Sequence, residues 1–176
     1  MPAKKNPPGR AASLEGEVFL ALLRAADSLL RQLEELLKTS GLSHTQYNVL
    51  RILRGAARGA EREARRIEKG AAARSENEDG GLPCGEIAAR MITRDPDITR
   101  LLDRLESRGL VERSRQKQDR RVVQARITPA GVKLLGELDA PVERLHRKQM
   151  RAIPRGHLQQ LLRLLEEVSS AANAQQ

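Results

Sequence analysis

Apolar residues recur every three or four positions along much of the chain, which is the spacing of amphipathic helices. The first run extends from Leu14 to Leu37 and predicts a long helix that ends near Gly41. A second helix begins at Ser43-His44-Thr45-Gln46, whose S-x-x-Q spacing is typical of a capping box. The residues that this second helix should turn inward are Tyr47, Leu50 and Leu53.

Residues 55–81 break this pattern, and we interpret them as an insertion. Five glycines surround an Ala-rich stretch of alternating charge, which favours a solvent-exposed helix for part of the segment. Residues 75–81 are expected to form a flexible, acidic loop. Seven basic and six acidic residues lie between Arg54 and Asp79, so the charges nearly cancel and the segment is not an obvious phosphate-binding arm.

Two short helices joined by a tight turn follow Pro83, which is the helix-turn-helix pattern. Asp95-Pro96 is expected to open the second of them, because Asp caps a helix well and Pro fits its first position. That helix should end at Gly109 through a left-handed cap. The inward residues are Ile87, Ala88 and Met91 on the first helix and Ile98, Leu101, Leu102 and Leu105 on the second.

Segments 110–113 and 122–127 read as the two strands of a hairpin with a basic, polar loop between them. Thr128-Pro129 then opens another helix, in which Pro141 predicts a kink or break near Ala140. A last, leucine-rich helix follows Pro154. The expected order is therefore four helices, two strands and two helices, a mainly α (α+β) fold.

Charge points to a polyanionic partner. Lys and Arg number 32 against 23 Asp and Glu, which gives a net charge of +9. With 39% apolar residues, no stretch approaches the roughly 20 apolar residues that cross a bilayer, so we expect a soluble protein. Residues 1–12 read as a short disordered arm, and a single cysteine, Cys84, favours a reducing, cytoplasmic setting.

Several functional classes are disfavoured. One Tyr, one Phe and no Trp cannot form the stacking surfaces that bind single-stranded nucleic acid. The chain has no Gly-rich phosphate loop, no paired-His metal motif and no nucleophile elbow, and its three histidines are dispersed. We therefore expect no enzyme, no metal and no cofactor.

The chain resembles the multiple antibiotic resistance regulator (MarR) family of bacterial winged-helix transcription factors. The segments that carry the resemblance are GLSHTQYNVLRIL at 41–53, EIAARM at 86–91, DITRLLDRLESRGLVER at 97–113, DRRVV at 119–123 and ITPAG at 127–131. The resemblance implies a homodimer with a helical dimerisation region from 13–40 and 129–172 and a winged helix-turn-helix DNA-binding domain at 41–128. The insertion at 55–81 departs from the family pattern.

The second helix of a helix-turn-helix lies in the major groove, and Arg is well suited to a bidentate contact with guanine. Residues outside the apolar stripe of that helix are the candidate readers: Thr93, Arg94, Asp97, Thr99, Arg100 and Arg104. For each arginine the alternative is a phosphate contact or a solvated charge. Asp103 is expected to be a local salt-bridge partner.

The hairpin would form a wing that reaches the minor groove or its phosphates. Its candidate DNA contacts are Arg113, Arg115, Lys117, Asp119, Arg120 and Arg121. In the family an Asp-x-Arg element is typical of the wing. It matches Asp119 and Arg121 here and implies that Arg121 meets the minor groove while Asp119 holds a neighbouring arginine. The alternative for Asp119 is a turn-forming residue.

The resemblance also implies a small phenolic or other aromatic anion that releases DNA. His44, Tyr47 and Arg51 could offer it a ring, a hydroxyl and a charge, although capping, core packing and surface exposure would explain them equally. Cys84 at a helix N-terminus has a position that favours thiolate. The reactive cysteine of the family's redox-sensing branch lies near the chain's N-terminus, so we expect Cys84 to be inert.

The sequence therefore predicts a dimeric, ligand- or stress-responsive bacterial transcription regulator, a repressor by family default. It would bind a pseudo-palindromic operator with half-sites about one helical turn (~10 bp) apart. The alternative is a winged-helix protein that uses the same surface for protein contacts or as a sequence-neutral architectural factor. The mixture of Thr, Asp and Arg at the reading positions favours the regulator.

Overall fold

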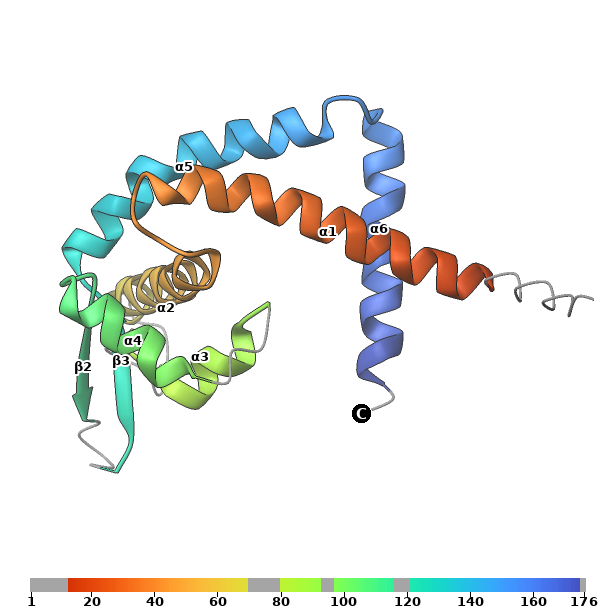
Figure 1. Cartoon of the computed structure of the whole chain (residues 1–176). Helices are drawn as coiled ribbons and strands as arrows, with labels where there is room; N and C mark the ends of the chain where they lie inside the picture. The colour runs from red at the N-terminus through yellow and green to blue at the C-terminus, as the bar shows by residue number, and fades with distance from the viewer. Residues whose placement is uncertain (1–12, 70–79, 93–96, 116–120, 175–176) are drawn as a thin grey trace, which may run out of the picture.

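The computed structural model describes residues 13–69, 80–92, 97–115 and 121–174. Within these ranges the chain forms mostly helices around a small sheet (Figure 1). The elements are α1 (Leu14–Lys38), α2 (His44–Glu68), β1 (Leu82–Pro83), α3 (Cys84–Arg90), α4 (Ile98–Ser107), β2 (Val111–Arg115), β3 (Val123–Ile127), α5 (Pro129–Met150) and α6 (Arg155–Asn173).

The expected mainly α fold with a β-hairpin is confirmed, and the sheet contains a third strand. Its order is β1-β3-β2 and all pairs are antiparallel. The hairpin register places Val111 opposite Ile127, and β1 adds Leu82 opposite Ala125. With two residues, β1 is too short to show the alternating pattern by which a strand is recognised in a sequence.

The core lies between α2, α3, α4, the sheet and the first half of α5. The capping box at Ser43 and Gln46 starts α2 as expected, and α2 buries the three residues predicted to face inward. Ile87 on α3 and Leu102 on α4 are fully buried, as their spacing predicts. Gly109, at φ +66°, follows α4 in the left-handed conformation.

α1 and α6 lie mostly outside this core. Figure 1 shows α1 running along α5, while α6 descends from the far end of α5 at a distance from the sheet. Only Leu37 at the end of α1 is buried, and α6 buries no residue. Many of their apolar residues are consequently exposed within one chain. Within the described ranges, no helix is both long enough and apolar enough to span a membrane.

The region interpreted as an insertion continues α2 without interruption as far as Glu68, so its first part is helical as expected. Most of the predicted acidic loop falls in 70–79, outside the described residues. Its last residues are packed closely. A Cβ on Gly80 (φ +68°) would lie 3.0 Å from the Ala57 Cα, and one on Gly81 would lie 2.9 Å from the Gln124 side chain.

Two expected boundaries are wrong. The cap of α4 is Asp97 rather than Asp95, and its carboxylate accepts a hydrogen bond from the Arg100 backbone N–H at 3.1 Å. Pro141 does not break α5, which is continuous from Pro129 to Met150, so of the expected kink or break the break is excluded. Buried Leu138 and Val142 flank the proline, so packing on both sides holds the helix together although one backbone donor is missing.

Candidate nucleic-acid interface

α4 presents a polar face because its leucines are used for the core. Leu101, Leu102 and Leu105 are buried, which turns the intervening positions outward. The exposed residues of this face are Thr99, Arg100, Asp103 and Arg104. Three of the predicted readers, Thr99, Arg100 and Arg104, therefore lie on the solvent side of one helix. Thr93 and Arg94 lie outside the described residues.

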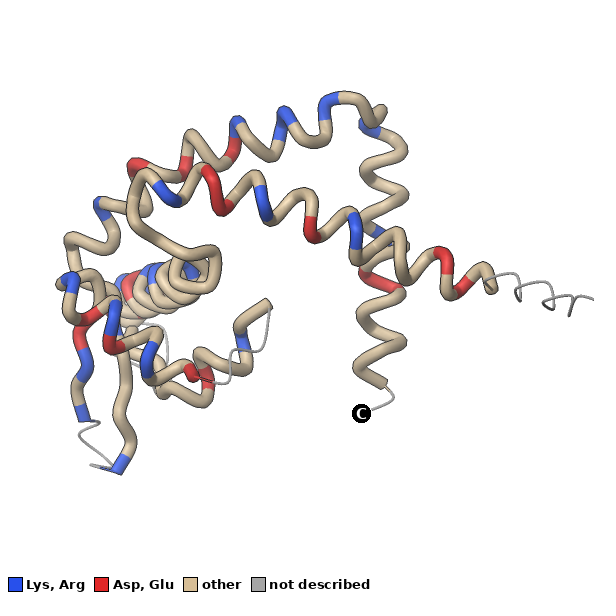
Figure 2. Tube along the Cα trace, in the orientation of Figure 1, with Lys and Arg blue, Asp and Glu red and all other residues tan. Residues whose placement is uncertain are grey.

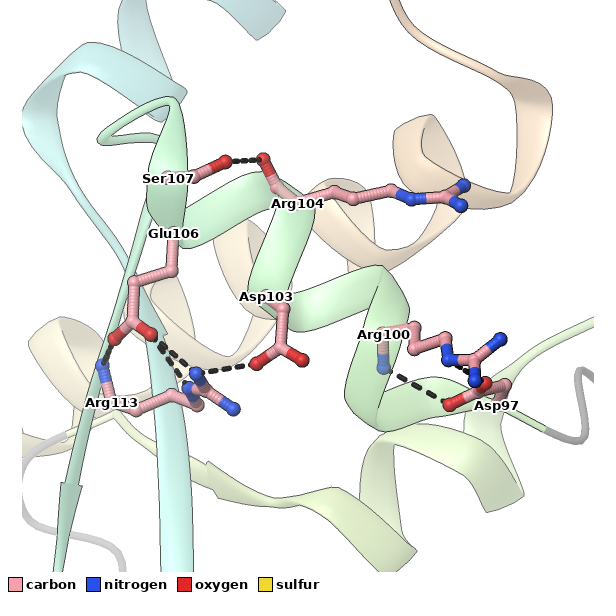
Figure 3. A network of polar contacts seen from close by, with 7 residues as sticks. All are labelled: Asp97, Arg100, Asp103, Arg104, Glu106, Ser107 and Arg113. Carbon is pink, nitrogen blue, oxygen red and sulfur yellow. Dashed lines mark hydrogen bonds and ion pairs between the residues drawn. The ribbon is translucent and has the colours of Figure 1, made fainter.

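Arg100 is held at the start of this face by the residue that caps α4. Its Nε lies 2.9 Å from Asp97 Oδ2, while its side chain remains 78% exposed. Figure 3 shows the two side chains side by side at the N-terminal end of α4. The ion pair thus orients the guanidinium near the helix start and leaves most of it accessible.

Arg113 belongs to a different network, which joins β2 to α4. Its backbone N–H donates to Glu106 Oε1 at 3.0 Å and its Nε donates to Glu106 Oε2 at 2.8 Å. Its Nη2 also lies 2.6 Å from Asp103 Oδ1 (Figure 3). These hydrogen bonds lower the pKa of Glu106 and raise the pKa of Arg113. Asp103 is confirmed as a salt-bridge partner, and Arg113, expected among the wing contacts, points back toward α4.

The wing carries its charges at the far ends of the strands. Arg115 ends β2 and Arg121 precedes β3, and both are exposed. Figure 2 shows basic residues at these ends. Lys117, Asp119 and Arg120 lie outside the described residues, so the orienting role of Asp119 stays a prediction.

The three residues of the predicted ligand site lie within about 60° of one face on the first turns of α2. His44 Nδ1 lies 3.3 Å from Glu34 Oε1 of α1, and its buried Nε2 has no hydrogen-bond partner among the described residues. Tyr47 is buried, and burial raises the pKa of its phenol. The Arg51 guanidinium carbon lies 5.8 Å from the Tyr47 ring centroid. No spacing in the sequence indicates Glu34 as the partner of His44.

Two further contacts, absent from the sequence prediction, join the lobe around the sheet to the long helices. Arg54 of α2 donates two hydrogen bonds, of 2.8 and 2.7 Å, to the Asp139 carboxylate of α5. Arg108, after α4, donates to the carbonyl oxygens of Gly41 and Ser40 at 2.7 and 2.8 Å. The partners are 67 to 85 positions apart, so no local spacing could indicate them.

Metal ligands and the single thiol are the remaining candidates for chemistry in the described part of the chain. No group of three His, Cys, Asp or Glu there could hold a metal ion. Cys84 Sγ lies 3.8 Å from the Val123 carbonyl oxygen, a weak contact of a thiol at the edge of the core.

Comparison with known proteins agrees with this geometry. The MarR family model matches residues 77–123. A MarR transcription factor from Planctomyces limnophilus is 38% identical, over 89% of this chain and 98% of that one, with a TM-score of 0.59. A mutant MarR from E. coli complexed with operator DNA is 20% identical over 91% and 99% of the chains, with a TM-score of 0.71. The homoprotocatechuate degradative operon repressor of Escherichia coli is 24% identical over 93% of this chain and 95% of its own length.

Proposed function

This chain belongs to the MarR family of DNA-binding transcription regulators, and we propose that it acts as a homodimeric repressor on a pseudo-palindromic operator. The observation that carries the proposal is the solvent face of α4, where Thr99, Arg100 and Arg104 stand clear of the core. A helix of this kind fits the major groove, where its first residues meet base edges.

We assign base reading first to Arg100. Its pairing with Asp97 fixes the side chain at the helix start and reduces the freedom that a contact with guanine would otherwise remove. Arg104, one turn later, is proposed to contact bases or phosphates. Asp97, Thr93 and Arg94 complete the proposed reading set.

The wing is proposed to strengthen DNA binding without reading bases in the major groove. Arg115 and Arg121, together with Lys117, Asp119 and Arg120, would meet the minor groove and its phosphates. Arg113 is proposed to position the wing instead, because two carboxylates of α4 already hold its guanidinium.

Exposed leucines support the homodimer. α6 exposes Leu161, Leu162, Leu164, Leu165 and Val168, and α1 exposes Leu14, Val18, Phe19, Leu20 and Leu23. Apolar faces of this extent mark interaction surfaces, and a second copy of α1, α5 and α6 would cover them. We therefore assign 13–40 and 129–172 to dimerisation and 41–128 to DNA binding. Two lobes in one dimer predict half-sites about one helical turn (~10 bp) apart.

Titration of the purified protein against its own upstream intergenic DNA and a scrambled duplex, at several salt concentrations, tests the proposal. Tight binding to the first duplex alone, with two chains per site, is expected. Arg100→Ala should reduce the preference for the first duplex by about 1–3 kcal/mol. Equal, steeply salt-dependent binding to both duplexes would instead favour a sequence-neutral architectural protein.

Release by a small hydroxylated aromatic acid is a second part of the proposal. It is supported by the shared helix face of His44, Tyr47 and Arg51, by the contact of Arg51 with the Tyr47 ring and by the operon that the E. coli relative represses. Homoprotocatechuate is a suitable probe, because its carboxylate can pair with Arg51. We expect it to weaken operator binding by the wild-type protein and to have much less effect on Arg51→Gln. Unchanged operator binding with this and related phenolic acids would contradict the ligand role.

A further inference from the structure

The second half of α2 separates charges that nearly cancel in the sequence. Arg58, Arg62, Arg65 and Lys69 follow one another at i, i+4, i+7 and i+11, and all four are exposed. At 3.6 residues per turn they occupy about 60° of the helix surface over about 16 Å. We call these four residues the outer stripe. Figure 2 shows the accumulation of basic residues on α2.

Acidic residues of the same helix offset only part of the charge of the outer stripe. Glu63 pairs with Arg66 at 2.7 Å on another part of the helix surface. Glu61 and Glu68 lie on one flank, about 70–90° from the middle of the stripe. Asp139 is held by two hydrogen bonds from Arg54, although its charge is also felt by Arg58. No outer-stripe residue forms an ion pair with any carboxylate that the structure describes.

Helix stability does not explain this arrangement. Basic residues in a last turn interact favourably with the helix dipole, but that effect covers only Arg65 and Lys69. Arg58 and Arg62 lie farther back, and Arg58–Arg62 and Arg65–Lys69 are like-charged i, i+4 pairs that weaken a helix. Glu61 and Glu68 are helix neighbours of Arg58 and Arg65 and offset part of this repulsion, so the stripe keeps a basic excess that a bound polyanion would neutralise.

The composition of the outer stripe fits a nucleic-acid backbone better than a protein or a membrane. Protein interfaces are centred on apolar or aromatic residues, and membrane-surface helices bury an apolar face. The stripe contains neither, and the half-exposed Ile67 lies on the other side of the helix. Phosphates repeat every 3.4 Å of axis along one strand, so 16 Å spans about five of them.

We propose that the outer stripe is a second DNA-backbone contact, distinct from α4 and the wing. It lies on the side of α2 opposite buried Leu53, so it would engage a stretch of duplex other than the one against α4. This contact adds to the proposed function, but it is independent of sequence reading. It would raise affinity for long DNA by counterion release.

The experiment measures binding of the full chain to a fluorescent random-sequence duplex of about 60 bp over a range of salt concentrations. The test variant carries Arg58→Gln, Arg62→Gln, Arg65→Gln and Lys69→Gln. We expect its affinity to fall at least about tenfold and the slope of log K against log salt to decrease by about two to four. A variant with Arg58→Lys, Arg62→Lys and Arg65→Lys keeps the charge and should retain the wild-type slope.

Two outcomes would overturn the proposal: an unchanged slope in the glutamine variant, or an equal loss in the lysine variant. Circular dichroism confirms that both variants keep the helix. A third variant, Arg100→Ala with Arg121→Ala, separates this inference from the proposed function. This variant is titrated against the upstream intergenic duplex and its scrambled counterpart. If it prefers the intergenic duplex as strongly as the wild type does, while the glutamine variant loses affinity for random DNA, the proposed role of α4 and the wing fails and the outer stripe stands.

Discussion

Arginines near α4 divide into two groups according to what already surrounds them. Arg100 has one carboxylate partner and remains 78% exposed, so most of its donors are available. Arg113 is held by Glu106 and Asp103, and its side chain is 26% exposed. A phosphate would have to displace two carboxylates to reach Arg113. Arg100 and Arg113 carry the same charge, but their different surroundings predict different roles in DNA binding.

Replacing Arg113 should weaken operator binding without changing its salt dependence. Arg113→Ala removes the link between β2 and α4, with a loss of about 1–2 kcal/mol in the free energy of unfolding. Because no phosphate contact disappears, the slope of log K against log salt should stay at the wild-type value. Arg121→Ala, in the wing, is the matched variant and should lower the slope by about one. A lower slope for Arg113→Ala would make Arg113 a phosphate contact after all.

The Asp139 carboxylate gives the protein a specific pH response. Its pKa is lowered by the hydrogen bonds from Arg54, so the unfolded chain binds more protons than the folded chain in mildly acidic solution. The stabilisation is complete above the ordinary Asp pKa and is lost as the pH falls toward the lowered value. Asp139→Asn should flatten this part of the stability-against-pH curve, by at most about 1 kcal/mol because the pair is partly exposed. An unchanged acid limb would contradict this contribution.

Residue-scale predictions from the sequence succeeded where helical periodicity applies. The inward positions of α2 and α4 are set by neighbours three and four residues away, which the sequence displays directly. Ion pairs depend on which distant elements meet. Arg54 and Asp139 are 85 positions apart, so their pairing becomes visible only once α2 and α5 are packed. Arg113 was assigned to the wing contacts for the same reason: its partner carboxylates lie on α4, and the sequence does not show that α4 and β2 meet.

Element boundaries show which local rules hold under packing. The capping box of α2 and the Thr128-Pro129 start of α5 are as predicted, because a cap involves residues three positions apart. α4 begins after Asp97 rather than after Asp95, and α5 continues through Pro141 without a break. In both cases a local preference was outweighed, by an alternative cap at Asp97 and by buried residues on both sides of the proline.

Gly131 is required where α5 meets the hairpin. A Cβ there would lie 2.4 Å from the Leu110 carbonyl oxygen and 2.7 Å from Ile127 Cγ1. The Leu110 oxygen cannot move easily, because it accepts a hydrogen bond from the Thr128 N–H. Gly131→Ala should therefore lower the free energy of unfolding by about 1–3 kcal/mol in urea denaturation.

Gly136, on the same helix, is the control for that substitution. A Cβ at Gly136 would meet no atom within 4 Å, and the residue is exposed. Gly136→Ala should raise the free energy of unfolding by about 0.5–1 kcal/mol, because alanine loses less backbone entropy in a helix. The two substitutions should thus have opposite signs, and similar effects would show that the hairpin contact does not constrain Gly131.

At the scale of the whole molecule, the α2–α5 and Arg108 contacts tie the lobe around the sheet to the long helices. Arg108 reaches the loop after α1 from the end of α4, and Arg54 fixes α2 to α5. A change in how the long helices pair would therefore be passed to the position of α4. For the proposed homodimer, this arrangement predicts that dimerisation and DNA binding are energetically linked.

Disrupting the exposed face of α6 should consequently abolish both dimerisation and tight operator binding. Leu162 is 58% exposed in one chain, so Leu162→Asp has little effect on the fold of that chain but places a charge in the proposed interface. The wild-type melting temperature should rise with protein concentration, because association stabilises the folded state, and that of the variant should not. Ser170→Asp adds the same charge on the side of α6 opposite the exposed leucines and should behave as wild type. Sedimentation equilibrium and operator titration measure the two losses together. A monomeric Leu162→Asp protein that binds the operator with wild-type affinity would show that a single lobe suffices.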